Sequence, residues 1–402
     1  MPQSRPSAPP GPPPSTELPT ILLTGGTGVL GRALIDELSP DFRIICLRHR
    51  TPLNDPRVRE VRADLLEPGL GLPQADLGQL AAEVDLVLHS GAATNWRAAP
   101  DAIRRANLGG TATMLDLAAR ADAPFYHMST AFIANPLAPE EQERFPGAAV
   151  YLASKAAAEQ AVRDAPVPGV ILRPSVVMGD SVTGRIAGVQ GLTRALGAIV
   201  KGQVPVLPGA PDARIDMVPQ DVVARAVGDL LRDRVTAGEY WLTAGAQALL
   251  QREVVDTCLE FAERHGPRPH PPRLIPVESV HRLLLPLIEG PTFPESLRRR
   301  FRTYAELLLV FQRALPFASS LGSPHCGSAL SKDALKQALV RNLTAWSTGP
   351  GGIGSRSRHR AQAQPQAQQQ PQPQQQPQPQ PQAQPLVPVA ATAPRAARER
   401  AS

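Results

Sequence analysis

Cysteine and aromatic side chains are scarce in this 402-residue sequence, and each shortage excludes a class of protein. The three cysteines, Cys46, Cys258 and Cys326, stand far apart, so we expect neither a metal site nor a disulfide framework. Cys46 lies inside an apolar strand pattern and is expected in the core. Aromatic residues make up 4% of the chain and no zinc-finger spacing is present, so nucleic acid is not an expected partner.

Long apolar runs and a leader pattern are also lacking. No stretch approaches the roughly 20 apolar residues of a membrane span, and no basic segment followed by an apolar run stands at the N-terminus. We therefore expect a cytoplasmic protein. Residues 1–18 are rich in Pro and Ser, and residues 361–385 are almost entirely Gln, Pro and Ala. Because such segments bury little apolar surface, we predict disordered ends over 1–18 and 348–402.

Between these ends, short apolar runs alternate with helical patterns, which predicts an α/β fold. We expect a Rossmann-type doubly wound parallel sheet over residues 19–250, with substrate elements from about residue 180, and a smaller, mainly helical substrate or lid subdomain over 251–347. Later helices are expected at 251–265, 278–289 and 295–315. The strands are predicted at 20–23, 43–48, 58–64, 84–92, 123–130, 169–175 and 239–245.

A glycine-rich turn joins the first predicted strand to the first predicted helix. Residues 24–31 read TGGTGVLG, with glycines at Gly25, Gly28 and Gly31. Because glycine lacks Cβ, its backbone can approach a pyrophosphate closely, and the helix N-terminus presents free N–H groups to that anion. The strand–turn–helix context therefore predicts a dinucleotide site.

The end of the second predicted strand indicates which dinucleotide is bound. An acidic side chain there would hydrogen-bond the ribose 2′-hydroxyl of NAD, whereas residues 47–50 read LRHR. The planar guanidinium of Arg48 suits a 2′-phosphate. We predict NADPH (NADP) as cofactor; the alternative is that Arg48 merely faces solvent.

One of the four tyrosines stands four residues before one of only four lysines, in the segment YLASKAAAE that begins at Tyr151. Residues four apart share a helix face, so Tyr151 and Lys155 are expected to point the same way. We predict that the Lys155 ammonium lowers the pKa of the Tyr151 phenol and contacts the nicotinamide ribose. A hydroxyl after the fifth strand, Ser129 or Thr130, is expected to bind the substrate oxygen. The alternative is an exposed surface pair.

Together these motifs resemble the extended short-chain dehydrogenase/reductase family over residues 19–248. HSGAATNW, STAF and DMVPQDVVA are most similar to the fatty acyl reductase and thioester reductase branch, which carries the male sterility-type NAD-binding domain. In that branch the hydroxyl residue matches Thr130, which we therefore favour over Ser129. The motifs that carry the resemblance are TGGTGVLG, ADL (63–65), HSGAATNW (89–96), NLGGT (107–111), STAF (129–132), YLASK (151–155), LRPSVVMGD (172–180) and IDMVPQDVVA (215–224).

The resemblance implies a set of site residues in the glycine loop and in the segments after the later strands. Asp64 and Leu65 would lie near the adenine, and Asn107 would brace the strand ends; the alternative for each is plain packing. The expected catalytic residues are Thr130, Tyr151 and Lys155. The expected cofactor-binding residues are Thr24, Gly25, Thr27, Gly28, Val29, Leu30, Gly31, Arg48, Asp64, Leu65, Ser90, Gly91, Ala92, Asn107, Lys155, Pro174 and Ser175.

The resemblance also implies an activity. We expect an NADPH-dependent oxidoreductase that reduces a carbonyl-type substrate, in particular a fatty acyl or polyketide thioester on coenzyme A or an acyl carrier protein, to an aldehyde or an alcohol. The sequence holds no adenylation or carrier segment, so the thioester is expected to arrive from elsewhere. The alternatives are a hydroxysteroid-type dehydrogenase or a nucleotide-sugar epimerase or dehydratase on the same scaffold, and a non-catalytic NADP-sensing scaffold protein.

Two further features have competing interpretations. Residues 298–313 read RRRFRTYAELLLVFQR, which suits a lid helix with outward arginines; contact of this helix with a membrane surface is the less favoured alternative. His89 and His127 fall near the ends of predicted strands, and we treat them as packing residues rather than acid–base groups.

Overall fold

The computed structural model describes residues 18–188, 191–276 and 310–349, together with isolated positions between 279 and 298 and residue 352. The chain divides into a compact unit of residues 1–357 and a second unit of residues 358–402. All described residues belong to the first unit. Nearly all of the predicted disordered ends, and most of the helices predicted at 278–289 and 295–315, lie outside the described residues; Thr348, the first residue of the predicted C-terminal disorder, is helical.

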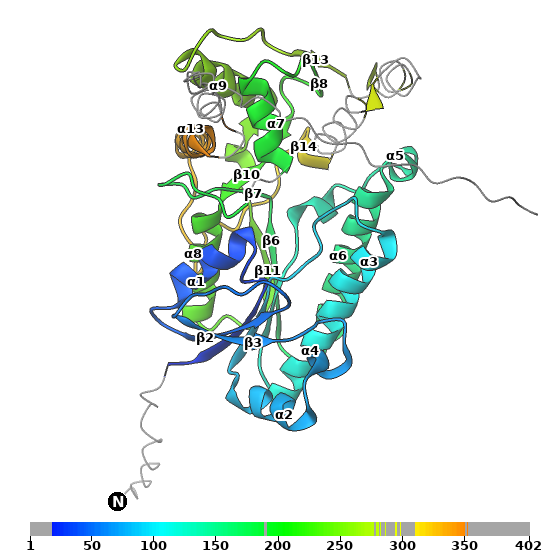
Figure 1. The fold of residues 1–402 in the computed structure, drawn as a ribbon, viewed down its shortest axis with the longest axis vertical. Coiled ribbons are helices and arrows are strands. Elements are labelled where there is room, and N and C mark those ends of the chain that lie inside the picture. Colours follow the sequence, from blue (N-terminus) through cyan, green and yellow to red (C-terminus); the bar gives the residue numbers. More distant parts are fainter. Residues whose placement is uncertain are drawn as a thin grey trace, which may run out of the picture. The chain divides into compact units, whose positions relative to one another are not determined.

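A parallel sheet of seven strands organises the first unit, which confirms the predicted fold class (Figure 1). The strand order is β11-β6-β5-β4-β1-β2-β3. Every neighbouring pair is parallel, so all carboxyl ends meet at one edge of the sheet. The strands are β1 (Thr20–Thr24), β2 (Arg43–Arg48), β3 (Val58–Arg62), β4 (Leu86–His89), β5 (Phe125–Met128), β6 (Gly169–Pro174) and β11 (Gly238–Leu242).

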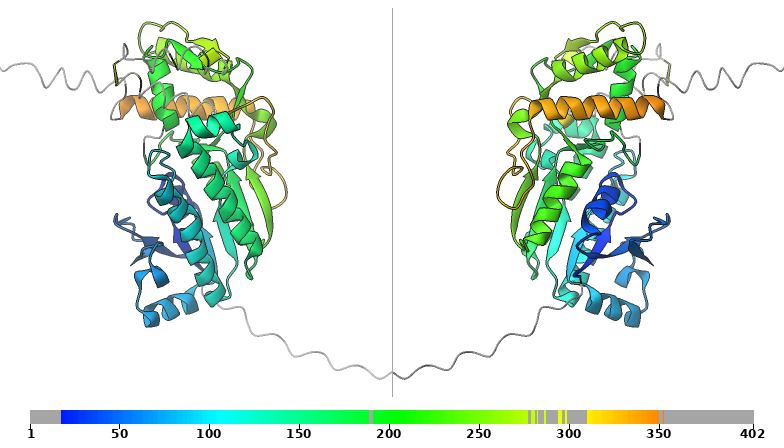
Figure 2. Two further views of the ribbon diagram at one scale, coloured as in Figure 1. Left: turned by 90° about the vertical axis from the view of Figure 1, so that its right-hand side faces the viewer. Right: turned by 90° about the vertical axis from the view of Figure 1, so that its left-hand side faces the viewer.

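The sheet is buried on both faces because successive side chains of each strand point to opposite sides. On β1, Ile21 and Leu23 join the core under helices α1 and α8, whereas Leu22 joins the core under α2, α4 and α6. Figure 2 shows these two helix layers from opposite sides. The helices are α1 (Val29–Leu38), α2 (Gln74–Glu83), α4 (Gly110–Ala121), α6 (Pro146–Asp164) and α8 (Gln220–Arg232).

The helical segment between β4 and β5 has an irregular start that the sequence pattern did not show. Helix α3 (Pro100–Arg104) runs through one π-helical turn, η2 (Arg105–Gly109), into α4. Such wide turns inside helices often occur at functional sites. Here the turn carries the buried Asn107, which is 1% exposed.

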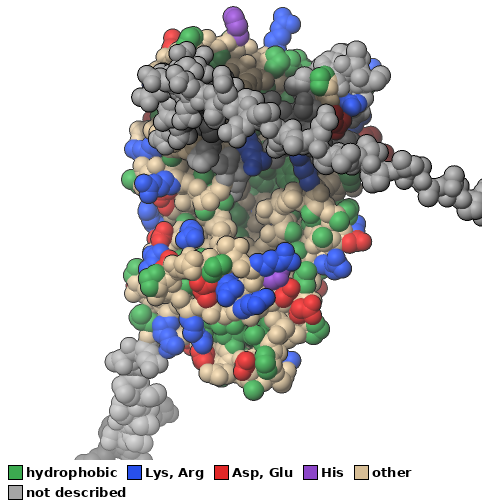
Figure 3. All heavy atoms as spheres, in the orientation of Figure 1, with side chains coloured by type: hydrophobic (Ala, Val, Ile, Leu, Met, Phe, Trp, Pro, Cys, Tyr) green, Lys and Arg blue, Asp and Glu red, His purple; other side chains and the backbone are tan. Residues whose placement is uncertain are grey.

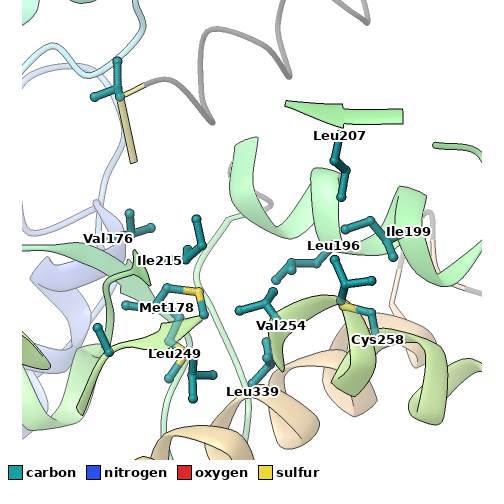
Figure 4. Packing of buried hydrophobic residues seen from close by; sticks show 14 of the residues in the cluster. Val176, Met178, Leu196, Ile199, Leu207, Ile215, Leu249, Val254, Cys258 and Leu339 are labelled. Carbon is teal, nitrogen blue, oxygen red and sulfur yellow. The ribbon is translucent and has the colours of Figure 1, made fainter. Parts of the chain in front are cut away.

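The second part of the unit, which we call the cap layer, packs around its own apolar core. Its helices α7 (Gly191–Val200), α9 (Gln251–Glu263) and α13 (Lys332–Thr348) pack side by side, and Figure 4 shows Leu196, Val254, Cys258 and Leu339 meeting between them. Its short strands are β8 (Val206–Pro208), β9 (Arg214–Ile215), β12 (Leu249–Leu250), β13 (Arg273–Ile275) and β14 (Gln312–Arg313).

Short elements connect the sheet to the cap layer. Strand β7 (Val176–Met178) continues from β6 and pairs with β10 (Met217–Pro219), which leads into α8. The remaining short helices are η1 (Pro68–Gly71), η3 (Ala131–Ala134), α5 (Pro139–Arg144) and η4 (Gly245–Gln247).

Two elements of the cap layer differ from the sequence prediction. The prediction that the helix starting at residue 295 continues to residue 315 is wrong. Gln312 and Arg313 instead form β14, which pairs antiparallel with β9. The helix α13 was not predicted. Its signals were present: Ser331 caps the first turn by accepting the Ala334 N–H, and Leu335, Leu339 and Leu343 follow at helical spacing. Among the described residues, no helix is both long and apolar enough to cross a bilayer.

Candidate active site

The glycine loop lies at the point where the strand order reverses. Strand β1 has β2 on one side and β4 on the other, and ligands of doubly wound sheets bind at this kind of switch point. Gly25 has φ 77°, and a Cβ on it would lie 2.8 Å from Gly91 N. A Cβ on Gly31 would lie 2.2 Å from Gly25 O. Both glycines are therefore required for close packing of strand, loop and helix.

The start of α1 fits a bound pyrophosphate. Gly28 is the N-cap residue, no side chain caps the helix, and its first turn carries no acidic residue. The free N–H groups of this turn, with their partial positive charge, suit an anion. Thr27 and Gly28 are exposed and Val29 is half-buried, whereas Leu30 points into the core.

Thr24 ties the glycine loop to the segment after β4. Its Oγ1 accepts the Gly91 N–H at 2.9 Å and lies 2.8 Å from Nδ1 of His89. Thr24 is 1% exposed, so its hydroxyl is occupied by these protein contacts. This bond holds the Ser90–Ala92 segment beside the glycine loop.

The predicted adenosine end of the site is rich in basic groups. Arg48 Nε lies 3.3 Å from Glu60 Oε2, and the Glu60 carboxylate also accepts the N–H groups of Leu53 and Asn54. Arg48 is therefore partly paired, which neither of the two sequence interpretations anticipated. Figure 3 shows basic side chains over the β2 and β3 edge on this face, and the sequence there supplies only arginines.

Asp64 and Leu65 follow β3 at the same edge. The Asp64 carboxylate accepts the Leu66 N–H at 3.0 Å, and its other oxygen lies 3.2 Å from Nε2 of His49. Leu65 packs at the margin of the core that α2 and α4 cover. Both residues thus lie at the carboxyl end of β3. The contacts that they make within the protein stabilise the loop and the core, and their expected contact with the adenine stays a prediction.

Tyr151 and Lys155 lie one turn apart on α6 and are both turned into the molecule. Lys155 is 2% exposed, and its Nζ donates to the Met128 carbonyl at 2.6 Å and lies 3.4 Å from Nε2 of His127. Burial lowers the pKa of Lys155 from 10.5 to about 8, although the nearby Glu159 charge raises it. The predicted alternative of an exposed surface pair is wrong for this arrangement.

The Tyr151 phenol differs from the sequence expectation. Burial raises its pKa to about 12, and the hydrogen bond with the Thr130 side chain lowers it by less. The prediction that Lys155 lowers the pKa of the phenol is therefore wrong. The ammonium is hydrogen-bonded to the end of β5, and the loss of water around the phenol has the larger effect on its pKa. Tyr151 is therefore protonated at neutral pH and carries a hydroxyl proton that it can donate.

Thr130, rather than Ser129, is the hydroxyl that the structure brings to Tyr151. Thr130 begins η3 and its Oγ1 accepts the Phe132 N–H at 3.4 Å. Ser129 is also buried, and its Oγ has no partner within the described residues. The difference follows from the strand geometry, in which adjacent side chains point to opposite sides.

Asn107 links the segment after β4 to the helix that carries Tyr151. Its side chain accepts the Ala93 N–H at 2.7 Å and donates to the Ser154 hydroxyl at 2.9 Å. Ser154 in turn donates to the Tyr151 carbonyl at 2.7 Å. Sequence reasoning singled out Asn107 and missed Ser154. A small polar residue at an inward position of YLASK was the available signal.

A buried ion pair fixes the same helix to the sheet and was also missed. Glu159, one turn beyond Lys155, is 1% exposed and forms two hydrogen bonds with Arg173 on β6, at 2.9 and 2.6 Å. Arg173 also pairs with Glu239 on β11 at 2.8 Å. Two-point contacts of this kind hold both partners in one orientation, so α6, β6 and β11 are locked together.

The far side of the site contains a second buried acid. Pro174 ends β6, and Ser175 follows it beside Asp216, which is 2% exposed. Asp216 accepts the N–H groups of Ala244 and Gly245, each at 2.9 Å. Burial raises the Asp216 pKa, while these N–H groups and the Ser175 hydroxyl lower it. Asp216 therefore organises the turn after β11.

An aromatic wall, built from the segments after β4 and β5 and from the cap layer, approaches Tyr151. Ring centroids are 6.0 Å apart for Trp96 and Tyr151, 5.7 Å for Trp96 and Phe311, and 5.1 Å for Phe311 and Phe132. Phe317 continues the row at 5.4 Å from Phe132. These rings make the surroundings of the phenol apolar, which is consistent with its raised pKa.

Comparisons with known proteins agree with this arrangement. A family model for an NAD-binding domain, described as "Male sterility protein", matches residues 42–227. The hybrid PKS-NRPS synthetase pvhA of Talaromyces variabilis is 29% identical over 230 residues, which is 54% of this chain and 6% of that protein. The chain spans only 3–6% of the length of the curated relatives it matches.

Solved structures give the same picture. The terminal R domain from the myxalamid PKS-NRPS biosynthetic pathway is 29% identical with a TM-score of 0.62, covering 82% of this chain and 91% of that one. UDP-glucose 4-epimerase of Thermotoga maritima is 14% identical with a TM-score of 0.54, covering 81% and 98%. At that identity the epimerase shares the fold alone.

Proposed function

The chain belongs to the extended short-chain dehydrogenase/reductase family, in its branch with the male sterility-type NAD-binding domain, and from this premise we propose that it reduces an acyl thioester with NADPH. Membership confirms the resemblance found in the sequence and makes the chain an NAD(P)-dependent oxidoreductase. The matched segment contains Thr130, Tyr151 and Lys155.

The glycine loop and the segments after β4 and β6 hold the dinucleotide. The N-terminus of α1 takes the pyrophosphate, and the Ser90–Ala92 segment, held by Thr24, forms the opposite wall. Arg48 and the exposed Arg50 at the end of β2 favour the 2′-phosphate of NADPH, since no acid follows this strand directly. When bound, the nicotinamide supplies the hydride.

The chain's own residues bind the carbonyl and handle the proton. Thr130 and Tyr151, already hydrogen-bonded to each other, both donate to the substrate carbonyl oxygen as negative charge develops on it. Tyr151 then gives its proton to that oxygen, which its pKa of about 12 permits because it is fully protonated beforehand. Lys155 stays charged below about pH 8, and its ammonium would hold the nicotinamide ribose in position.

The substrate class follows from the relatives and from the aromatic wall. The relatives are PKS-NRPS synthetases and a terminal R domain of such a pathway, so the carbonyl is that of an acyl thioester on a carrier protein or coenzyme A. The rings of Trp96 and Phe311 offer an apolar surface to the acyl chain next to Tyr151. After the hydride and proton are added, the resulting hemithioacetal expels the thiol and leaves an aldehyde.

One observation carries the proposal. A protonated phenol, a hydroxyl and a buried ammonium, contributed by Tyr151, Thr130 and Lys155, meet at the end of β5, on the same carboxyl edge of the sheet that carries the glycine loop. A scaffold protein that only sensed NADP would not require a protonated phenol hydrogen-bonded to a second hydroxyl beside this ammonium.

A substrate panel tests the proposal. NADPH and NADH oxidation are followed with acyl-CoA, acyl-carrier thioesters, ketosteroids and nucleotide sugars, with free thiol measured in parallel. Thiol release that requires NADPH supports the proposal. Turnover of steroids or sugars alone supports the other members of the family, and binding of NADPH without turnover of any substrate supports the scaffold alternative.

A further inference from the structure

Two histidines outside the catalytic set lie next to each other in the middle of the sheet. His89 on β4 is paired in register with His127 on β5, and the two rings stack with centroids 5.7 Å apart and planes inclined by 24°. His89 is 1% exposed and His127 is fully buried. The Phe125 ring flanks both, at 5.9 and 6.3 Å. Two buried imidazoles are an unusual choice where aliphatic side chains would fill the same space.

The pair connects at both ends to the site already described. On one side, His89 Nδ1 lies 2.8 Å from the Thr24 hydroxyl, which accepts the N–H of Gly91 in the segment after β4. On the other side His127 Nε2 lies 3.4 Å from Lys155 Nζ. A buried row of polar groups therefore runs across β1, β4 and β5. It begins at Thr24, next to the glycine loop, passes through the two histidines and ends at the ammonium of Lys155.

The chemistry of the partners assigns the protons of His127. An ammonium can only donate, so Nε2 of His127 must offer its lone pair and the ring is neutral with its proton on Nδ1. Burial and the positive charge of Lys155 lower the pKa of His127 well below 6.5, and lower that of His89 to about 3. Both rings are therefore neutral near pH 7, and the lone pair of His127 Nε2 is available to the ammonium.

We propose that His127 is a positioning residue for Lys155, whose ammonium it holds as an acceptor together with the Met128 carbonyl. Two of the three Nζ protons then point at β5, and the third is left for the side of the cofactor and Tyr151. His89, fixed by Thr24, stacks on the ring of His127 and keeps it in this orientation. The inference rests on the proposed function, in which Lys155 takes part in the reaction.

Other charged groups around Lys155 do not replace this contact. Glu159 lies on the same helix one turn further on, and its carboxylate is bonded to Arg173 and Arg163. Tyr151 is neutral and hydrogen-bonded to Thr130. In the described part of the chain, both hydrogen-bond partners of Nζ are thus on β5.

The test compares three substitutions in neighbouring positions of one strand. His127→Phe keeps a ring and removes the acceptor; His127→Gln restores an acceptor near the position of Nε2. Tyr126→Phe is the matched control, because Tyr126 faces the other side of the sheet and loses a buried hydrogen bond to the Val235 carbonyl without touching Lys155. The alkaline limb of kcat/KM, the NADPH Kd and the thermal midpoint are measured for each.

We expect His127→Phe to lower kcat/KM at pH 7 about tenfold and to move the alkaline limb down by about one pH unit, since a lost acceptor disfavours the ammonium. His127→Gln should recover most of both effects, and Tyr126→Phe should change neither. If the alkaline limb of His127→Phe stays with the parent while only its thermal midpoint falls, His127 is a packing residue and the proposal is overturned.

A second measurement does not depend on turnover. The chain has only four lysines, so the ¹³Cε signal of Lys155 in lysine-labelled full-length protein can be assigned by its loss in Lys155→Met. Its titration should give a pKa near 8 in the parent and a lower value in His127→Phe, or in His127→Asn if the phenylalanine variant does not fold. An unchanged Lys155 pKa in these variants overturns the positioning role even when no thioester is reduced. Absence of turnover with the expected titration shift overturns the proposed function instead.

Discussion

The sheet and the cap layer differ in the sequence separation between the strands that pair with each other. In the sheet, six of the seven strands come from residues 20–174. Most of these strands pair with the strand that comes next in the sequence, and the exception is the pairing of β1 with β4. In the cap layer, β9 pairs with β12 on one side and with β14, almost one hundred residues later, on the other. The proposed catalytic residues lie on α6 and directly after β5, whereas Phe311 and Phe317 of the aromatic wall come from the late segment.

This difference suggests a division of labour. The sheet and α6 fix the proton donor, the ammonium and the dinucleotide loop through buried bonds such as Asn107–Ser154 and Arg173–Glu159. In the proposed function, the cap layer contributes the rings of Phe311 and Phe317 to the acyl-chain side of the site. We therefore expect substitutions in the first region to change the chemical step, and substitutions in the second to change stability or the choice of acyl chain.

The largest expected effect is on Lys155. Lys155→Met should lower kcat by at least about a hundredfold, because the nicotinamide ribose loses the ammonium that holds it in position for hydride transfer. The same substitution should raise the free energy of unfolding by about 2 kcal/mol, since the pKa of the buried ammonium is lowered from 10.5 to about 8 at an unfavourable desolvation cost. Steady-state kinetics and urea unfolding of the one variant check both signs. A less stable variant would show that the ammonium holds the fold rather than the reaction.

Stability of the two regions can be separated with a matched pair. Leu339→Ala in α13 and Leu88→Ala in β4 each remove a fully buried leucine, and each should cost about 2–5 kcal/mol. Only Leu88→Ala should also weaken NADPH binding, because Leu88 directly precedes His89 and the Ser90–Ala92 segment that is proposed to line the cofactor. Equal NADPH Kd values for the two folded variants would remove the distinction between the regions.

The pH dependence of turnover sharpens the account of the sheet region. Lys155 is charged below about pH 8 and neutral above it, whereas Tyr151 keeps its proton to about pH 12. We expect kcat to fall about tenfold per pH unit above pH 8. Between pH 8 and 10.5 the unfolded chain binds the Lys155 proton and the folded chain does not, so this residue's contribution to stability rises with pH. An activity plateau that extends to pH 10 would contradict the assignment.

The smallest effect is expected in the cap layer at Phe311. Phe311→Ala removes ring contacts to Trp96 and Phe132, each worth about 1 kcal/mol. KM for long-chain thioesters should rise about fivefold while kcat changes little. Short-chain thioesters serve as the internal control, because they reach less of the wall. A fall in kcat with an unchanged KM would place Phe311 in the chemical step.

Much of the sheet region could be predicted from the sequence because its signals are local. The runs around Ile21, Ile45 and Val87 are short and apolar, and the glycine loop follows the first of them directly. The pair Tyr151 and Lys155 could be placed on one helix face from its spacing alone. The strand ends were predicted too long, since the polar motifs that follow β4 and β5 are loops at the carboxyl edge.

What the sequence did not reveal depends on contacts between distant segments. The pairing of Arg173 with Glu159 and of β14 with β9 has no local pattern. The direction of the Tyr151 pKa shift was wrong for the same reason: helix spacing predicts that Lys155 lies near, but only the packing shows that its ammonium bonds Met128 and that the phenol is desolvated. His127 was treated as packing because its contact with Lys155 crosses from a strand to a helix.

The most direct measurement of the central claim is thiol release from an acyl thioester by the parent and by Tyr151→Phe, with NADPH consumption recorded in the same cuvette. We expect the parent to release thiol only when NADPH is oxidised, and the variant to lose about a thousandfold in kcat while its NADPH Kd is unchanged. A variant that releases thiol as fast as the parent, or a parent that oxidises NADPH without releasing thiol, would contradict the account.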